Sequence, residues 1–368
     1  MTSNLHLLHV AGVSPWLDQI SRSMLDKGDL QRHVDDNAIR GVTSNPSIFA
    51  EAITKSNDYD EQVDEMAGRG ASTEEIIQTL MADDLRRACD VLAPVYEASD
   101  GRDGFVSVEV TPTLAHDTDA TIAEAREWSK TIDRPNLLVK VPATEAGLPA
   151  IEQLIAEGIS VNVTLIFSLE RYRKVMAAHV AGLQRASADG LDLSTIASVG
   201  SFFISRMDVE VDQRLDDLGS EEALALKGTT AIANGLLAYE AFLDTYRGDD
   251  WEELVAAGAR VQRPLWASTS TKDPSYPDTL YVDTLVAPHT VNTMPLSTVE
   301  AFQDHGVTPV AFGPEEVAAA HTTLDRMADV GVDYDDVMDV LEREGVDKFI
   351  ASWDEVVDDV AGEVDTHR

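Results

Sequence analysis

Residues 137–144 read Leu137-Leu138-Val139-Lys140-Val141-Pro142-Ala143-Thr144, a short apolar run that ends near a proline. Runs of Val and Leu of this length are typical of a buried β-strand. Alternate side chains of a strand point to opposite faces, so Lys140 shares a face with Leu138 and lies opposite Val139 and Val141. Burial of an ammonium is costly and favours the neutral amine, which is a nucleophile for carbonyl groups. On this segment alone, an edge-strand lysine that reaches water is an equally good interpretation.

The composition limits the class of partner. The chain has 368 residues and a formal net charge of −38, from 66 acidic and 28 basic residues. Such a charge argues against nucleic acid and against anionic membranes as partners, and no apolar stretch is long enough to span a bilayer. One cysteine, Cys89, permits no internal disulfide, and the first residues do not resemble a signal peptide. We expect a cytoplasmic protein that is a monomer or a homodimer.

Seven further apolar segments are expected to form strands, with helical sequence between them. They are 13–18, 41–46, 105–110, 159–167, 196–203, 263–268 and 281–287. Strands that alternate with helices predict a parallel sheet, and eight of them fit a closed (β/α)8 TIM barrel with additional helices. A doubly wound open sheet is the alternative, although no glycine-rich dinucleotide motif or P-loop supports it. We expect a single domain over 1–368, with an acidic C-terminal helical extension from about 313 to 368 that packs on the barrel.

Three helix starts are also expected. Ser72 with Glu75, and Ser297 with Glu300, have the spacing of capping boxes, and Ser168 is placed to cap the helix that follows it.

The predicted strands share polar side chains on one face. On 105–110, for example, three valines alternate with Ser107 and Glu109, and other strands repeat this pattern. In a barrel the apolar face meets the helices and the other face points inward, so these polar side chains should converge near the strand ends. Each one alone also fits a structural role. The set expected inside the barrel is Asp18, Thr43, Asn45, Glu109, Lys140, Asn162 and Thr164.

This set of residues favours one kind of chemistry. A lysine beside carboxylates and hydroxyls is typical of catalysis through a Schiff base. The nine histidines lack the spacing of metal ligands, and no pair of cysteines exists. We therefore expect neither a metal nor an organic cofactor.

Several of these strands resemble the motifs of the transaldolase family, from about residue 12 to about 290. The segments that carry the resemblance are Trp16-Leu17-Asp18, Gly41-Val42-Thr43-Ser44-Asn45-Pro46, Val108-Glu109-Val110, Val139-Lys140-Val141-Pro142-Ala143-Thr144 and Asn162-Val163-Thr164-Leu165-Ile166-Phe167-Ser168. The family is formed by (β/α)8 barrels of the pentose phosphate pathway that act as class I aldolases. The Thr-Ser-Asn-Pro and Val-Lys-Val-Pro-Ala-Thr elements together are highly specific.

The resemblance implies a role for each matching residue. Lys140 would form the Schiff base with the C2 carbonyl of a ketose phosphate. Asp18 would take the proton of the C4 hydroxyl, and Glu109 would move protons through a water held by Thr164. Asn45 and Asn162 would hold the hydroxyls of the dihydroxyacetone unit, and Thr43 belongs to the same substrate site.

The resemblance also implies a phosphate site, built from Ser201 and Arg206 after the sixth strand. A structural alternative is that Arg206 pairs with Asp208 or Glu210 on its own helix. Relatives often have a second arginine after the seventh strand, whereas here Ser270 stands near that position. Either Lys272 supplies the second positive charge or hydroxyl groups take its place.

The implied activity is transfer of a dihydroxyacetone unit between sugar phosphates. The donor would be fructose 6-phosphate or sedoheptulose 7-phosphate, and the acceptor erythrose 4-phosphate or glyceraldehyde 3-phosphate. One alternative is a lyase of the fructose-6-phosphate aldolase type, which releases free dihydroxyacetone, although enzymes of that type are much shorter. Another is a sugar-phosphate-binding protein without catalytic activity.

Overall fold

Eight parallel strands form a closed barrel in a computed structural model that describes residues 3–366. The strands follow one another around the barrel in chain order, and β8 pairs with β1. They are β1 (Val13–Leu17), β2 (Gly41–Val42), β3 (Phe105–Glu109), β4 (Leu137–Pro142), β5 (Val161–Ile166), β6 (Ser198–Phe203), β7 (Arg263–Ala267) and β8 (Thr290–Met294). The barrel expected from the sequence is confirmed.

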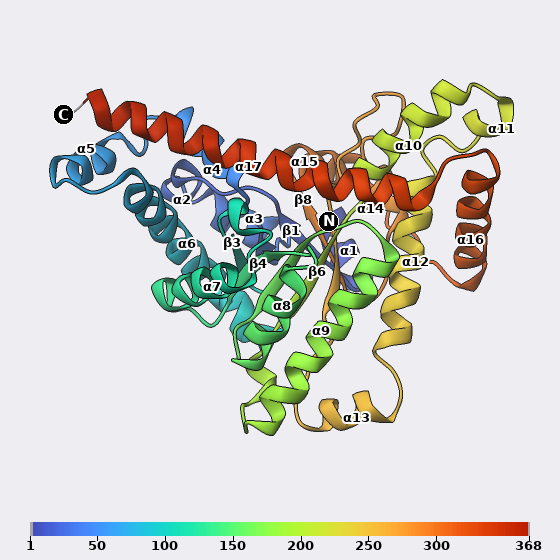
Figure 1. The fold of residues 1–368 in the computed structure, drawn as a ribbon, viewed down its shortest axis with the longest axis horizontal. Coiled ribbons are helices and arrows are strands. Elements are labelled where there is room, and N and C mark those ends of the chain that lie inside the picture. Colours follow the sequence, from blue (N-terminus) through green and yellow to red (C-terminus); the bar gives the residue numbers. More distant parts are fainter. Residues whose placement is uncertain (1–2, 367–368) are drawn as a thin grey trace.

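Helices surround the barrel, as the alternation of segments predicts (Figure 1). Those before β6 are α1 (Asn4–Val10), α2 (Arg22–Asp26), α3 (Asp29–Asp36), α4 (Pro46–Thr54), α5 (Asp60–Gly68), α6 (Thr73–Ala98), η1 (Pro112–Leu114), α7 (Thr118–Ile132), α8 (Gly147–Ala156), α9 (Leu169–Ala188) and η2 (Leu193–Thr195). The later ones are α10 (Ser205–Leu218), α11 (Glu221–Leu224), α12 (Thr230–Thr245), α13 (Asp249–Ala256), α14 (Leu280–Thr284), α15 (Leu296–His305), α16 (Pro314–Asp329) and α17 (Tyr334–Thr366). Among the described residues, no helix has the length and apolar character needed to cross a membrane.

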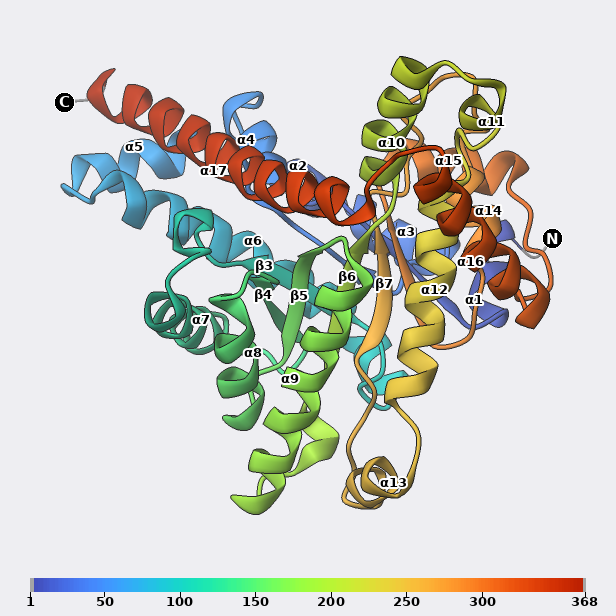
Figure 2. The same cartoon turned by 45° about the vertical axis from the view of Figure 1, so that its right-hand side comes forward.

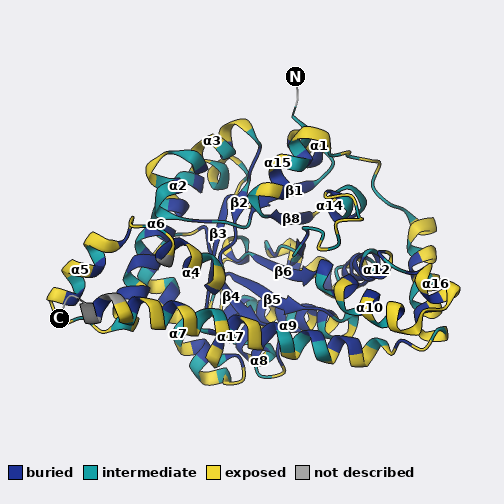
Figure 3. Cartoon of the chain, turned by 90° about the horizontal axis from the view of Figure 1, so that it is seen from above, coloured by how far each residue is buried: buried dark blue, intermediate teal, exposed yellow. Residues whose placement is uncertain are grey.

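The strands are buried on both faces because helices cover the outside and side chains fill the inside. In β3, Val106 and Val108 on the outer face and Ser107 on the inner face are all fully buried. Seen from above, the strands are buried, while the helices show exposed residues on their outer sides (Figure 3). This double burial is the reason that the strands appear in the sequence as nearly continuous apolar runs.

The helix starts agree with the sequence in two of three places. Ser72 and Glu75 form the expected capping box at α6, and the Ser168 side chain accepts a hydrogen bond from the backbone of Arg171 at α9. The capping box predicted for Ser297 and Glu300 is wrong. Helix α15 starts at Leu296 with Pro295 as its N-cap residue, and no side chain caps it. Ser297 therefore lies inside the helix.

The eighth strand is not where the sequence pattern placed it. Residues 281–287 carry α14, and the strand that closes the barrel is Thr290–Met294. In the earlier segment the buried residues Tyr281, Val282 and Leu285 have helical spacing, and Thr279 bonds the Asp283 side chain across the first turn. Strand β8 is half polar, with Thr290, Asn292 and Thr293 among its five residues, and it therefore lacks the apolar run that marks the other strands.

The last two helices, α16 and α17, occupy the region expected to form a C-terminal helical extension. Helix α17 runs across the end of the barrel at which the strands finish (Figures 1 and 2). Ser47 of α4 donates to Ser352 of α17 at 2.7 Å. A Cβ atom at Gly345 would lie only 3.2 Å from Leu165 Cδ2, so this glycine permits a close approach of α17 to the end of β5. The helix is thus fixed above the strand ends.

Candidate active site

Three strand residues form a row inside the barrel. The parallel register places Glu109 of β3 beside Lys140 of β4, and Lys140 beside Asn162 of β5. Ser107, two residues before Glu109 on the same face, accepts a hydrogen bond from Asn162 Nδ2 at 3.0 Å. The alternation read from the sequence therefore gives the correct inward face for β3, β4 and β5.

Lys140 is a buried ammonium with two polar partners. Its side chain is 6% exposed, and that of Glu109 is 2% exposed. Lys140 Nζ lies 2.9 Å from Glu109 Oε2 and donates to the backbone carbonyl of Ser44 at 2.9 Å. Burial raises the pKa of Glu109 above its ordinary value, and the charge and hydrogen bond of Lys140 oppose that shift. A proton can therefore pass between two groups in direct contact.

Asp18 follows β1 at the rim of the same pocket. Its Oδ1 accepts a hydrogen bond from Thr43 Oγ1 at 2.6 Å, and Thr43 also lies 2.6 Å from the Thr293 hydroxyl of β8. Burial raises the pKa of Asp18, and the Lys140 charge and the Thr43 hydrogen bond oppose the rise. A carboxylate with a raised pKa beside a buried amine is the arrangement expected of an acid–base group.

A chain of hydrogen bonds joins β3, β5 and β6. Ser201 Oγ donates to Asn162 Oδ1 at 2.7 Å, and Asn162 in turn donates to Ser107. Thr164 lies two residues beyond Asn162 on β5, and its hydroxyl is buried with no partner among the described residues. Glu109 Oε1 is also without a partner there. Two polar atoms near Lys140 are thus available for further hydrogen bonds.

Asn45 has a local structural role as well as a place in the pocket. It is the N-cap residue of α4, and its Oδ1 accepts from the backbone N–H of Ile48 at 3.0 Å. This bond fixes the side-chain orientation and leaves the Nδ2 donors unused by that contact.

These side chains surround a pocket of about 230 Å³ at the carboxyl ends of the strands. Eight of the ten residues expected at the site line it, whereas Glu109 and Asn162 lie outside its lining. The lining residues are Asp18, Thr43, Asn45, Lys140, Thr164, Ser201, Phe203, Arg206, Ala267, Ser268, Ser270, Lys272, Thr293, Pro295 and Phe349. This is the end of the barrel at which TIM-barrel enzymes bind substrate.

Arg206 lies close to two aromatic rings at this pocket. Its guanidinium carbon is 5.0 Å from the ring centre of Phe203 and 5.7 Å from that of Phe349. Its Nη1 is buried and has no partner among the described residues. The alternative pairing on α10 does not form, because Asp208 bonds Thr230, Ala231 and Tyr281, and Glu210 pairs with Arg214. The guanidinium is free to bind an anion.

Lys272 and Ser270 stand together after β7. Lys272 is exposed, and its Nζ donates to Ser270 Oγ at 2.6 Å. Burial of part of the side chain and the nearby charge of Arg206 lower the pKa of Lys272. The sequence left open whether Lys272 or hydroxyl groups take the place of the second arginine. The structure places the amino group of Lys272 and the hydroxyl of Ser270 side by side at this position.

Six lining residues were not singled out from the sequence: Phe203, Ala267, Ser268, Thr293, Pro295 and Phe349. Thr293 was missed because the eighth strand was misplaced, and alternation in 290–294 would not have marked it, since the polar residues Thr290 and Asn292 have the opposite parity. Phe349 lies in the middle of α17, more than two hundred residues from Lys140, and no local pattern marks it. Among the described residues, no group of three or more His, Cys, Asp or Glu side chains is arranged to hold a metal ion.

Known proteins resemble this chain over almost its whole length. Residues 15–360 match the family described as transaldolase/fructose-6-phosphate aldolase. The transaldolase of Mycolicibacterium smegmatis is 55% identical over 365 residues, which cover 99% of this chain and 98% of that protein. The transaldolase of Thermobifida fusca is 54% identical over the full length of both chains. By both measures, this chain belongs to the transaldolase/fructose-6-phosphate aldolase family.

Proposed function

We propose that this protein is a transaldolase that works through an imine on Lys140. It would move a dihydroxyacetone unit from fructose 6-phosphate or sedoheptulose 7-phosphate to erythrose 4-phosphate or glyceraldehyde 3-phosphate, a reaction of the pentose phosphate pathway. The observation that carries the proposal is the buried contact of 2.9 Å between Lys140 Nζ and Glu109 Oε2, beside a pocket that Lys140 lines together with Arg206. The names of the relatives point the same way.

In the first step, Lys140 must lose its proton before it attacks the C2 carbonyl of the donor. Glu109 is in direct contact and has a raised pKa, so it is suited to accept that proton. The amine then adds to C2, and the carbinolamine loses water to give the imine. The hydroxyl of Thr164 and Glu109 Oε1 both lack protein partners, which supports a water between them that carries the proton to the leaving hydroxyl.

In the second step, Asp18 removes the proton from the C4 hydroxyl. The C3–C4 bond breaks, its electron pair moves into the imine to form an enamine, and the aldehyde fragment leaves. Thr43 bonds only Oδ1 of Asp18, so Oδ2 is the atom proposed to act as the base. Addition of the enamine to the acceptor aldehyde reverses these movements, and hydrolysis of the new imine frees Lys140.

The remaining expected residues are proposed to hold the substrate or to orient a residue that holds it. Asn45 would donate its Nδ2 to a hydroxyl of the dihydroxyacetone unit. Asn162 does not line the pocket, so we propose that it orients Ser201. The Oδ1 atom of Asn162 accepts a hydrogen bond from the Ser201 hydroxyl. Arg206, Ser201 and Lys272 would bind the phosphate, and the positive charges of Arg206 and Lys272 would offset the acidic field of the rest of the chain.

Borohydride trapping tests this proposal. With fructose 6-phosphate, we expect a stable adduct on the peptide that bears Lys140, identified by mass mapping and absent in Lys140→Met. Lys174→Met, which changes an exposed lysine 45% accessible to solvent, should leave the adduct intact. A folded protein that binds the sugar phosphate and yields no adduct would instead be a binding protein.

The acceptor requirement separates the two activities of the family. A transaldolase should convert little fructose 6-phosphate until erythrose 4-phosphate is added. Steady release of free dihydroxyacetone without any acceptor would assign the lyase activity to this chain.

A further inference from the structure

A second cavity lies at the opposite end of the barrel, where the strands begin. Its volume is about 390 Å³, larger than that of the candidate active site and within the range of about 300–1,000 Å³ typical of small-molecule pockets. Its lining comes from the first residues of β3, β4, β6 and β7 and from the loops before β1, β3, β6, β7 and β8. Leu138 lines this cavity, and Lys140, two residues further along β4, lines the other one.

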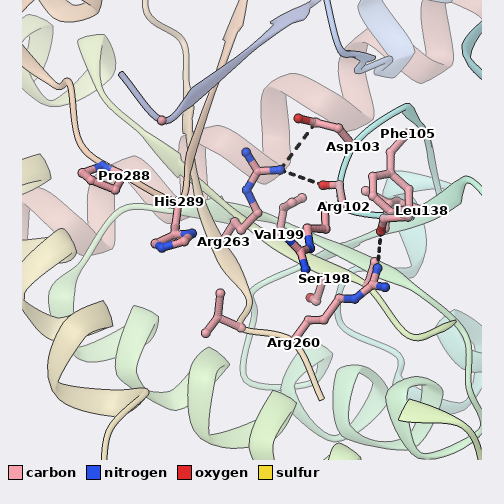
Figure 4. Close-up of a pocket in the computed structure, with 14 residues that line it drawn as sticks. Arg102, Asp103, Phe105, Leu138, Ser198, Val199, Arg260, Arg263, Pro288 and His289 are labelled. Atoms are coloured by element: carbon pink, nitrogen blue, oxygen red, sulfur yellow. Dashed lines mark hydrogen bonds and ion pairs between the residues drawn. The ribbon is translucent and has the colours of Figure 1, made fainter. Parts of the chain in front are cut away.

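Three arginines line this cavity in a chain whose net charge is −38. Figure 4 shows Arg260 and Arg263 beside it, with His289 on the side away from Phe105 and Leu138. The cavity lining includes one carboxylate, Asp103. That carboxylate already accepts from Trp16 Nε1 at 2.9 Å and from the Ser14 hydroxyl. Positive charge is therefore in local excess around the cavity.

Two of the arginines are held in place by the backbone. Arg263 donates to the carbonyls of Arg102 and Thr290 at 2.9 and 2.8 Å, and it pairs with Asp103 at 3.4 Å. Arg260 donates to the carbonyls of Gly101 and Asp100. These hydrogen bonds give the two side chains a structural role, since they stabilise the loop at 100–102 that precedes β3. They also fix the positions of the two guanidinium groups before any ligand binds.

The third arginine has no such explanation. The side chain of Arg102 is exposed and makes no hydrogen bond or ion pair with any residue in the range 3–366. His289, on the far side, has a left-handed backbone with φ of 63°, a conformation that is costly for a residue other than glycine. Burial, together with the charges of Arg263 and Arg102, lowers the pKa of His289, so the ring is neutral and offers one N–H donor.

The rest of the cavity wall is apolar. Phe105, Leu138 and Val199 are buried strand residues, and Val261 and Pro288 come from loops. A bare inorganic ion would leave this wall unused, whereas a molecule with an apolar, ring-sized body would cover it. Apolar walls with a few fixed polar groups are typical of sites for small organic ligands.

We propose that this cavity binds a small organic anion with a flat apolar body and one phosphate or carboxylate group. Arg102 and Arg260 contact the anionic group, Arg263 and His289 flank it, and Phe105 and Leu138 face the body. The site is independent of the proposed activity, because none of these residues lines the pocket around Lys140.

Calorimetric titration with adenosine 5′-monophosphate tests the site, with adenosine and inorganic phosphate as its two halves. We expect one saturable site for the nucleotide and at least tenfold weaker binding of each half. Arg102→Glu should weaken nucleotide binding at least tenfold. Arg247→Glu makes the same charge change at a side chain 71% exposed on the surface, and it should leave binding unchanged.

Two more variants locate the bound nucleotide. Val261→Trp fills the cavity from a half-buried position without changing charge, and it should also abolish binding. Arg206→Ala, at the other end of the barrel, should have no effect. The proposal is overturned if the nucleotide does not bind, if Arg102→Glu binds it as well as Arg247→Glu does, or if Arg206→Ala is the variant that loses it.

Discussion

The ring of Phe349 on the C-terminal helix lies 5.9 Å from the Nζ atom of Lys140. The same ring is 5.7 Å from the guanidinium carbon of Arg206. One aromatic side chain therefore lies near both the proposed nucleophile and the proposed phosphate ligand. Through this side chain, the last helix of the chain, α17, contributes to the pocket around Lys140 of β4.

Phe349→Ala should weaken use of sugar phosphates. A cation–π contact contributes about 0.5–2 kcal/mol, so losing the ring should lower kcat/KM for fructose 6-phosphate about 2- to 30-fold. Phe349→Tyr should retain most of the activity, since it keeps the ring. Asp354→Ala, at an exposed position of the same helix, serves as the control and should behave as the parent. Equal activity of Phe349→Ala and Asp354→Ala would show that the ring does not contribute.

Arg206 should matter for phosphorylated substrates only. A hydrogen bond to a charged group contributes about 1.5–3 kcal/mol, so Arg206→Ala should raise the KM for fructose 6-phosphate about 10- to 150-fold. Lys272→Ala should raise it less than about fivefold, because this lysine is exposed and its charge is screened. Slow turnover of unphosphorylated fructose should be the same in both variants and in the parent. An equal loss of activity towards unphosphorylated fructose in Arg206→Ala would show that Arg206 acts in a step other than phosphate binding.

The acid limb of the pH–rate profile should lie above the ordinary Asp value of 3.8. Burial raises the pKa of Asp18, and a general base acts only when ionised, so kcat/KM should fall as the pH drops towards that raised pKa. Glu109 is shifted in the same direction, so the apparent pKa belongs to both carboxylates.

Thr43→Val distinguishes the contribution of Asp18 to the acid limb from that of Glu109. The Thr43 hydroxyl stabilises the ionised carboxylate, so its loss should move the acid limb to still higher pH. Thr322→Val, at an exposed helical position, should leave the limb in place. Circular dichroism over the same pH range controls for unfolding. A limb that does not move in Thr43→Val would exclude Asp18 as the titrating base.

Gly147→Ala should destabilise the fold at the end of β4. A Cβ atom there would overlap the backbone carbonyl oxygen of Pro142, which cannot move without displacing the strand that carries Lys140. We expect a loss of about 3 kcal/mol in the free energy of unfolding, measured by urea titration, together with reduced turnover. Gly68→Ala, where nothing lies within 4 Å, should be neutral or slightly stabilising. Similar stability of the two variants would contradict this packing argument.

The sequence predicted the interior of the barrel well and its closure less well. Alternation with a period of two is a local property, so it placed Glu109, Lys140 and Asn162 on one inward face, and the register sets them side by side. It failed at β8, because a half-polar strand carries no apolar run while the neighbouring helical turn around Tyr281 does. Thr293 was lost from the predicted site for that reason.

The amino-acid sequence by itself determined the barrel, the lysine row and the family to which the chain belongs. Tertiary structure alone decided that Phe349 reaches Lys140, that Arg206 forms no ion pair with an acidic side chain of residues 3–366, and that three arginines meet around a cavity at the start of the strands. The physical reason is the separation along the chain of the residues that interact. A strand pattern repeats over two residues, whereas the direction in which α17 lies on the barrel depends on packing between segments far apart in the chain.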